Sequence, residues 1–202
     1  MPIPTALRTL LKPEDVLKQL GIRAGWRVVD FGCGAGYALV PAARFVGSSG
    51  RIVGIDVRAV AVDEARRRVE LAGVADRVDV FRADLTRPQA SGLPDGWADL
   101  ILLVGMLYQS EPQRVLREAA RVVKPSDGRI AVVEWEQVAT PLGPPSEQRV
   151  TKDTVLAAAK AAGLTFLSSS TPSPYQYGLT FSRAQAPRSS ESPRRGRNVA
   201  AV

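Results

Sequence analysis

Short apolar runs alternate along the chain with longer segments in which apolar residues recur at helical spacing. Val28–Val29, Arg51–Ile55 and Leu100–Val104 are rich in β-branched residues or leucine, as is typical of strands buried on both faces of a parallel sheet. Tyr37–Val46 and Arg58–Ala72 show the spacing of amphipathic helices. Strands that alternate with helices in this way predict an α/β domain built from βαβ units.

The rest of the chain continues this alternation. A cluster of prolines and a glycine interrupts it between Gln137 and Val150, which predicts a loop. We expect further helices at Pro13–Leu20, Glu111–Val123 and Lys152–Ala162, and further strands at Arg77–Arg82, Arg129–Val133, Leu164–Ser169 and Tyr175–Phe181.

The first strand leads into a turn with closely spaced glycines. Asp30 ends the strand, Gly32, Gly34 and Gly36 follow, and the next strand ends at Asp56. Glycine adopts the backbone angles of a sharp strand-to-helix turn, and its lack of a Cβ lets a ligand lie against the main chain. Asp56 follows Gly36 by 20 residues, close to the spacing of about 20 that places an acid beside a ribose hydroxyl. The unit therefore predicts a site for an adenosine-like ligand, towards which the following helix directs its free N–H groups.

Two classes of ligand use this arrangement, and the turn favours one of them. A dinucleotide site has the pattern G-x-G-x-x-G with a small sixth residue, whereas Tyr37 occupies that place here. The D-x-G-x-G-x-G pattern from Asp30 to Gly36 resembles motif I of the class I S-adenosylmethionine-dependent methyltransferases. The segment VLREAARVVKPSDGRIAVVEW is similar to the late motif of the ubiquinone/menaquinone-biosynthesis methyltransferases, although K-P-S-D-G replaces their usual K-P-G-G. A nicotinamide or flavin enzyme is the alternative.

The resemblance extends over most of the chain and implies a Rossmann-like class I methyltransferase fold. That fold has a seven-stranded, mostly parallel sheet with an antiparallel last strand and helices on both faces. Residues 1–12 would form an N-terminal segment and 13–182 the methyltransferase domain. We expect residues 183–202 to be a disordered basic tail, because they lack any periodicity. The first helix would either pack on the sheet edge or close over the cofactor.

The resemblance also implies a cofactor and its contacts. S-adenosyl-L-methionine would bind, and S-adenosyl-L-homocysteine would leave as the product. The glycine turn and its acid would hold the methionine end, Asp56 the ribose and Asp84 the adenine amino group. Asp84 can alternatively cap a turn, and Cys33 is expected to fill space rather than act as a nucleophile. The expected cofactor-binding residues are Asp30, Gly32, Cys33, Gly34, Gly36, Asp56, Val57, Asp84, Leu85 and Gly105.

The methyl acceptor is expected beside the carboxyl ends of the fourth and fifth strands. Tyr108 and Gln109 follow the fourth strand, and Glu134 and Glu136 lie at the end of the fifth. Tyr108, Gln109 and Glu134 are the candidate catalytic residues, and Tyr108 could face the sulfonium through a cation–π contact. The alternatives are that Tyr108 and Gln109 only form a helix-entry turn and that Glu134 holds the loop at 137–150. A sulfonium already activates its methyl group, so positioning, which is worth up to about 7–11 kcal/mol, would dominate catalysis.

Composition excludes several kinds of chemistry. The 202 residues include one cysteine, Cys33, and no histidine, which excludes an internal disulfide, a Ser-His or Cys-His pair and a Cys/His metal site. No apolar run reaches the length of about 20 residues that a membrane helix needs. The N-terminus lacks the order of regions found in a signal peptide, so we expect a cytoplasmic protein.

The formal charge of +7 is unevenly distributed. Residues after Ser182 carry +4, from five arginines and one glutamate, which leaves +3 for the rest. Such a mildly basic body gives little support for nucleic-acid binding, and Arg66–Arg68 is expected to be a solvated helix face rather than a phosphate site. The expected partner is a small-molecule or protein-side-chain acceptor, with a homodimer as one way to cover an open site. A module that binds the cofactor without transferring a methyl group is the rival hypothesis.

Overall fold

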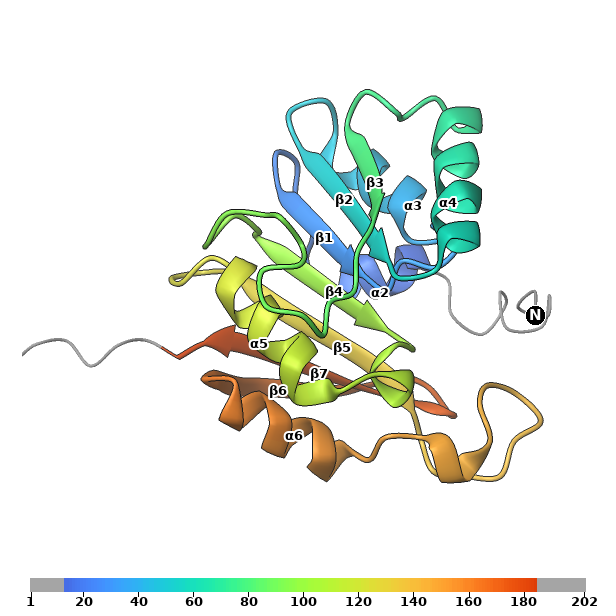
Figure 1. Cartoon of the computed structure of the whole chain (residues 1–202), viewed down its shortest axis with the longest axis vertical. Coiled ribbons are helices and arrows are strands. Elements are labelled where there is room, and N and C mark those ends of the chain that lie inside the picture. The colour runs from blue at the N-terminus through green and yellow to red at the C-terminus, as the bar shows by residue number, and fades with distance from the viewer. Residues whose placement is uncertain (1–12, 185–202) are drawn as a thin grey trace, which may run out of the picture.

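Seven strands form one sheet in the order β3-β2-β1-β4-β5-β7-β6 within residues 13–184, the part of the chain that the computed structural model describes (Figure 1). Neighbouring strands are parallel from β3 to β5, whereas β7 runs antiparallel to both β5 and β6. The expected seven-stranded sheet with a reversed last strand is confirmed. The strands are β1 Arg27–Phe31, β2 Arg51–Asp56, β3 Val78–Arg82, β4 Leu100–Val104, β5 Arg129–Trp135, β6 Leu164–Ser173 and β7 Gln176–Arg183.

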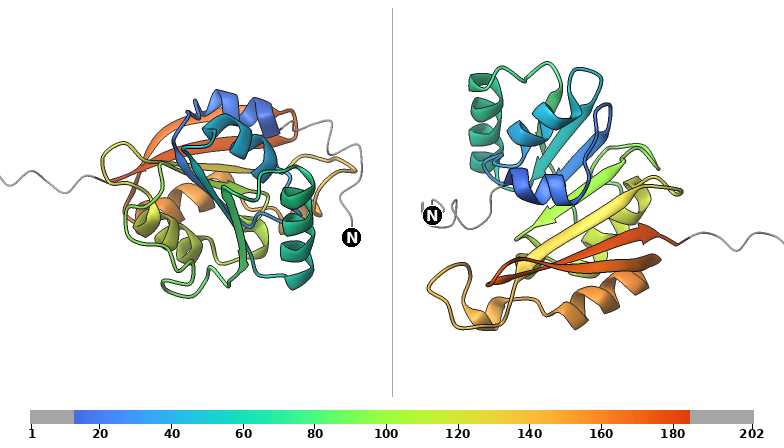
Figure 2. Two further views of the ribbon diagram at one scale, coloured as in Figure 1. Left: turned by 90° about the horizontal axis from the view of Figure 1, so that it is seen from above. Right: turned by 180° about the vertical axis from the view of Figure 1, so that it is seen from behind.

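Helices cover both faces of the sheet (Figure 2). One apolar cluster joins α2, α3 and α4 to one face, and a second cluster joins α5 and α6 to the other. The expectations for residues 1–12 and for the tail beyond residue 184 lie outside the described residues. The helices are α2 Pro13–Gln19, α3 Leu39–Val46, α4 Ala59–Leu71, α5 Pro112–Val122 and α6 Lys152–Ala161, with 3-10 turns η1 at Leu107–Gln109 and η2 at Ser146–Gln148.

The central strands β1 and β4 are buried on both faces, which explains why their sequences are continuous apolar runs. Val29 and Ile101 belong to the cluster under α5 and α6, whereas Val28 and Leu102 belong to the cluster under α3 and α4. Each side chain of this kind contributes about 1.5–3 kcal/mol when it is fully buried. Between residues 13 and 184, each helix is too short or too polar to span a bilayer.

The order of the strands reverses at β1. The next strand along the chain, β2, pairs with one edge of β1, and β4 pairs with the other. In open α/β sheets, ligands bind beyond the carboxyl ends of the strands at such a switch point. The glycine turn after β1 and the segment after β4 therefore meet at the place where a ligand is expected.

Some element boundaries differ from the expected ones. Helix α3 begins at Leu39 rather than at Tyr37, so the turn after β1 is longer than expected. Strand β6 continues to Ser173, although most of its side chains are exposed. Its serine-rich sequence carries no apolar alternation, and backbone hydrogen bonds to β7 extend the strand instead.

The loop between β5 and α6 is organised around Arg149, a buried arginine with 5% of its surface exposed. Its guanidinium lies 5.7 Å from the ring centroid of Trp135. A Cβ on Gly143 would lie only 2.6 Å from the same indole, so the loop packs directly on that ring. The guanidinium donates hydrogen bonds of 2.7–3.0 Å to the carbonyls of Glu136, Val138, Leu142 and Pro144.

We predict that Arg149→Met lowers the free energy of unfolding by about 1–3 kcal/mol, because four main-chain carbonyls lose their donor. Hydrogen exchange should show faster exchange in residues 137–150 and unchanged protection in β1 and β4. Arg129→Met is the matched control, because Arg129 also donates to two carbonyls but lies at the start of β5. Equal protection of the loop in both variants would contradict the role of Arg149.

Candidate functional site

The turn after β1 has three glycines in the left-handed backbone region. The angle φ is +75° at Gly32, +53° at Gly34 and +76° at Gly36, values that residues with a Cβ rarely adopt. A Cβ on Gly36 would lie 3.0 Å from the Cβ of Ala65 in α4. The third glycine is therefore required both by its backbone angle and by the close packing of α4.

The first glycine makes room for a side chain of the neighbouring segment. A Cβ on Gly32 would lie 2.7 Å from the Cβ of Met106, which follows β4. Met106 thus covers the main chain where the sequence predicts that a ligand lies. A ligand against Gly32 must displace this side chain, which is unbranched and adapts easily to its surroundings.

Asp30, near the end of β1, is a buried carboxylate with 4% of its surface exposed. Among the residues that the structure describes, none donates a hydrogen bond to it. Burial, together with the nearby charge of Asp56, raises the pKa of Asp30 to about 7. Because an unpaired buried charge is unfavourable, this position favours a ligand that brings a positive charge.

Asp56, at the end of β2, is also buried but is well supplied with donors. Its Oδ2 accepts a hydrogen bond from the N–H of Gly34 at 2.9 Å, and its Oδ1 accepts one from the N–H of Arg58 at 2.9 Å. The Nε of Arg58 adds a contact of 3.2 Å to Oδ1. The Arg58 side chain is 62% exposed, so solvent can readily replace this contact. Asp56 therefore joins the glycine turn to β2, and a ligand can displace the exposed Arg58 side chain from it.

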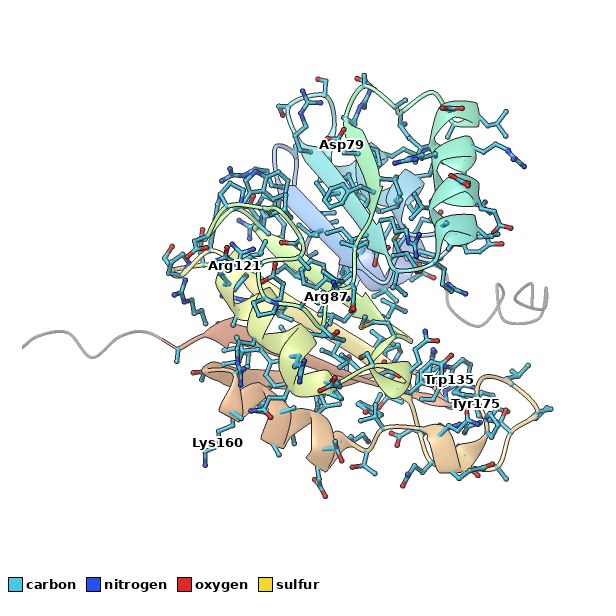
Figure 3. All side chains as sticks on the ribbon, viewed as in Figure 1. Asp79, Arg87, Arg121, Trp135, Lys160 and Tyr175 are labelled. Carbon is cyan, nitrogen blue, oxygen red and sulfur yellow. The ribbon has the colours of Figure 1, made fainter. Side chains whose placement is uncertain are left out.

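The residues expected near adenine lie after β2 and β3. Val57 is 52% exposed, whereas the side chain of Leu85 is buried in the core. The Oδ1 of Asp84 accepts hydrogen bonds from the hydroxyl and the N–H of Thr86, which hold the pKa of Asp84 below its ordinary value. Its Oδ2 lies 3.4 Å from Nε of the exposed Arg87 (Figure 3). The turn-capping alternative for Asp84 is therefore present in the structure, and its Oδ2 faces the exposed side chain of Arg87.

Glu134 and the turn after β4 meet beyond the carboxyl ends of the parallel strands. Glu134 is fully buried, and its Oε1 accepts a hydrogen bond of 2.6 Å from the N–H of Leu107. Within residues 13–184, its Oε2 has no hydrogen-bond partner. Burial raises the pKa of Glu134 to about 7, although nearby main-chain N–H groups act in the opposite direction. Burial, and then the charge of Glu134, also raises the pKa of the half-buried Tyr108.

The structure brings Tyr108 and Glu134 together but leaves Gln109 exposed. All three belong to the η1 turn or hold it, as the helix-entry alternative requires. The other alternative is that Glu134 holds the loop at 137–150. Within residues 13–184, Glu134 makes no hydrogen bond to that loop, since its Oε1 accepts from Leu107 and its Oε2 has no partner. The side chain of Arg149 donates to the loop carbonyls instead. Glu136 pairs instead with Lys152 of α6.

Cys33 behaves as the expected space-filling residue of the turn. It is buried, and its Sγ donates to the carbonyl of Gly34 at 3.7 Å. Burial and the neighbouring carboxylates of Asp30 and Asp56 raise the pKa of its thiol, which disfavours a thiolate nucleophile.

Gly105, one of the expected cofactor-binding residues, follows β4 with φ of +60°. A Cβ added there would lie 3.8 Å from Nε1 of Trp135. Trp135 and Tyr175 lie at the same end of the sheet (Figure 3), where the N–H of Glu136 donates to the carbonyl of Tyr175. Sequence reasoning missed Met106 and Arg58, because only their position after a strand end distinguishes them.

The charges at this edge of the sheet favour a cationic ligand. Asp30 and Asp56 place two carboxylates beside the glycine turn, and the guanidinium of Arg58 contacts Asp56. A pyrophosphate at the same turn would meet the buried carboxylate of Asp30, which disfavours a dinucleotide. Among residues 13–184, no group of three or more His, Cys, Asp or Glu residues is placed to hold a metal ion.

Comparison with known proteins agrees with this geometry. Residues 28–126 match the family model described as a methyltransferase domain. A methyltransferase crystal structure from Aquifex aeolicus, described as S-adenosylmethionine dependent, has a TM-score of 0.79 and 29% identity, and the match covers 88% of this chain and 93% of that one. The chain therefore contains a class I S-adenosylmethionine-dependent methyltransferase domain.

Curated relatives show which methyltransferases this domain resembles in sequence. Methyltransferase GfsG of Streptomyces halstedii is 32% identical over 122 residues, which cover 60% of this chain and 42% of the relative. The ubiquinone/menaquinone biosynthesis C-methyltransferase UbiE of Hahella chejuensis is 29% identical over 123 residues, which cover 60% of this chain and 48% of the relative. The domain is thus similar to the ubiquinone/menaquinone-biosynthesis group. The chain spans about half the length of the curated relatives that it matches.

We predict that Asp30→Asn becomes more stable relative to the unmodified protein as the pH rises from about 4 to 7. The folded-state pKa of Asp30 is raised from 3.8 to about 7, so the folded state binds this proton more tightly than the unfolded state does. In the unmodified protein, the protonated carboxyl of Asp30 contributes its full stability below about pH 4. This contribution is lost as the pH rises through 7, by up to about 1.4 kcal/mol for each pH unit.

Chemical denaturation at several pH values, without ligand, measures this difference. Asp79→Asn is the control, because Asp79 is an exposed carboxylate on β3 (Figure 3). If the relative stability of Asp30→Asn does not change with pH, the carboxylate is not held unpaired in the folded protein.

Proposed function

We propose that the protein is a methyltransferase that binds S-adenosyl-L-methionine at the switch point between β1 and β4 and methylates an acceptor by in-line displacement. The observation that carries this proposal is the buried carboxylate of Asp30, to which no described residue donates a hydrogen bond. It lies beside a turn of three left-handed glycines. The cofactor has an ammonium and a sulfonium, and it would supply the positive charge that this acid lacks.

The glycine turn would receive the methionine end of the cofactor. In this assignment Asp30 binds the ammonium, and the main chain from Gly32 to Gly36, with Cys33 and Gly34, faces the carboxylate. Three N–H groups of the turn are already used, since Gly32 and Cys33 donate to the carbonyl of Ile55 and Gly34 donates to Asp56. These bonds fix the turn before any ligand arrives, which reduces the ordering that binding requires.

The nucleoside would occupy the ends of β2 and β3. Asp56 accepts hydrogen bonds from the ribose hydroxyls once Arg58 has moved into solvent, and the exposed Val57 covers one face of the adenine. Asp84 uses its Oδ2 for the adenine amino group, and Leu85 contributes only its main chain, because its side chain is buried. Gly105 lines the side from which the acceptor approaches.

The cofactor, when bound, would supply an activated methyl group: an electron pair of the acceptor would form the new bond to carbon, and the electron pair of the broken carbon–sulfur bond would remain on sulfur in S-adenosyl-L-homocysteine. The protein's contribution is to align these atoms, which is worth up to about 7–11 kcal/mol in well-oriented systems. Tyr108 is half-buried and can face the sulfonium or the acceptor. Glu134 positions Tyr108 by holding the η1 turn, and the exposed Gln109 can contact a large acceptor.

The acceptor is either a small molecule or a protein side chain. The relatives GfsG and UbiE are named as methyltransferases, the second for quinone biosynthesis, but the chain matches only part of each. The loop at 137–150 is folded around its own Arg149, which supports an uncovered acceptor side or one covered by a second subunit. The single cysteine supports a reducing, cytoplasmic location.

One observation favours a second candidate, a module that binds the cofactor without transferring the methyl group. Glu134 is fully buried, so none of its surface is open to receive a proton from an acceptor. Acceptors that lose no proton in the rate-limiting step, or that transfer it to water, remain compatible with the enzyme. The decisive difference between the two candidates is therefore product formation.

We predict that the full chain, given S-adenosylmethionine with a labelled methyl group and a fractionated cell extract, produces a labelled product in at least one fraction. Asp56→Ala should abolish most of this transfer at low cofactor concentration, because a ribose hydroxyl pair loses its acceptor at about 1–3 kcal/mol. Binding measured by calorimetry without labelled product in any fraction would support the binding module instead.

We also predict that Arg58→Ala binds S-adenosylmethionine up to about fivefold more tightly than the unmodified protein, because an exposed ion pair that competes for Asp56 is worth at most about 1 kcal/mol. Titration calorimetry at low salt measures the change. Arg114→Ala is the control, since Arg114 is exposed to a similar degree and pairs with a different acid, the exposed Glu111. Weaker binding by Arg58→Ala would mean that the guanidinium contacts the cofactor rather than competing with it.

A further inference from the structure

We propose that Arg68 of α4 is a positioning residue for the methionine end of the cofactor, because it fixes the glycine turn at Ala35 and Tyr37, whereas Asp56 fixes it at Gly34. This inference rests on the proposed function, since it concerns how tightly the turn holds S-adenosylmethionine. Arg68 is one of three successive arginines that the sequence places on a solvated helix face. The structure assigns a different contact to it.

Arg68 contacts the turn on both sides of its third glycine. Its Nε donates a hydrogen bond of 2.8 Å to the carbonyl of Ala35, although the two residues are 33 positions apart. Its guanidinium carbon lies 4.0 Å from the ring centroid of Tyr37. A single side chain therefore holds the residue before Gly36 and the residue after it.

These contacts fix the orientation of one peptide group. The carbonyl of Ala35 accepts from Arg68, while the N–H of Gly36 donates to the carbonyl of Cys33 at 2.9 Å. With both ends bonded, the peptide between Ala35 and Gly36 cannot rotate freely. Glycine-rich backbone has the most conformational freedom to lose on binding, so fixing this peptide in advance strengthens the binding of a ligand to the turn.

The two neighbouring arginines lack this function. Arg66 donates to the carbonyl of Val80 in β3 at 2.9 Å and so fastens the helix to the sheet. Arg67 is exposed, and it is the member of the run that fits the expected solvated face. Lysine could not replace Arg68, because only a planar guanidinium can donate in its plane and stack on an aromatic ring at the same time.

Helix α4 does not depend on Arg68 for its own placement. Its buried residues Ala61, Val62, Ala65 and Val69 pack against the sheet, and Ala65 contacts the turn directly at Gly36. Loss of the guanidinium should therefore release the turn while the helix stays packed. The loss of binding affinity should therefore concern only the methionine end of the ligand, which the turn holds.

The test compares ligands with and without the methionine end. Calorimetry gives the Kd of S-adenosylmethionine, S-adenosylhomocysteine and 5′-methylthioadenosine, which keeps the adenine, ribose and sulfur but lacks the amino acid. Arg68→Gln should weaken the first two by about tenfold, the loss of one charge-assisted hydrogen bond, and should leave 5′-methylthioadenosine within about twofold. Arg66→Gln should change none of the three, and Arg68→Lys should behave like Arg68→Gln.

Each other outcome overturns the inference. Equal weakening of all three ligands would assign Arg68 a general structural role, and unchanged binding would assign it none. If Arg68→Gln does not fold, as judged by its Tm, Arg68→Lys carries the same comparison with the charge and the stem retained. If the unmodified protein binds none of the ligands, the proposed function fails, and this result is distinct from a failure of Arg68.

Discussion

An acid that folding leaves without a partner is the constraint on which the site depends. Parallel strands bury Asp30 at the end of β1, and no other described residue supplies a hydrogen bond to it. Folding tolerates such a group at a free-energy cost that a packed apolar residue would avoid. A ligand that carries a positive charge would give Asp30 a partner. The glycine turn, the switch in strand order and the acids at the carboxyl ends of β1 and β2 would then all serve to bind that ligand.

Much of the architecture could be predicted from the sequence, because strand period, helix period and glycine placement are local properties. The central strand β4 matches its expected range from Leu100 to Val104, since burial on both faces leaves an unbroken apolar run. The prediction was weakest where local signals are absent. Strand β6 is extended by pairing with β7 rather than by its own exposed side chains, and α3 begins late because the packing of Ala65 on Gly36 shapes the turn.

The candidate site divides in the same way. The glycines and acids of the turn could be found because they occupy fixed positions after strands. The long side chains could not, since an arginine reaches partners that lie far away in the sequence. Arg149 holds four carbonyls of its loop, and Arg58 covers the acid that the nucleoside would need. Glu134 was correctly placed at the edge of the sheet, but its partner, the N–H of Leu107, follows from the register of β4 and β5.

Met106 gives the site a feature that protein engineering can use. Its side chain lies over Gly32, at the start of the turn that would receive the methionine end of the ligand, to which the sulfonium belongs. The room available to a transferable group is therefore set by one flexible, replaceable residue rather than by the rigid sheet. Shortening that residue would enlarge the space without touching the acids that grip the nucleoside. The position after β4 is accordingly the natural one to vary when synthetic sulfonium donors with bulkier alkyl groups are to be accommodated.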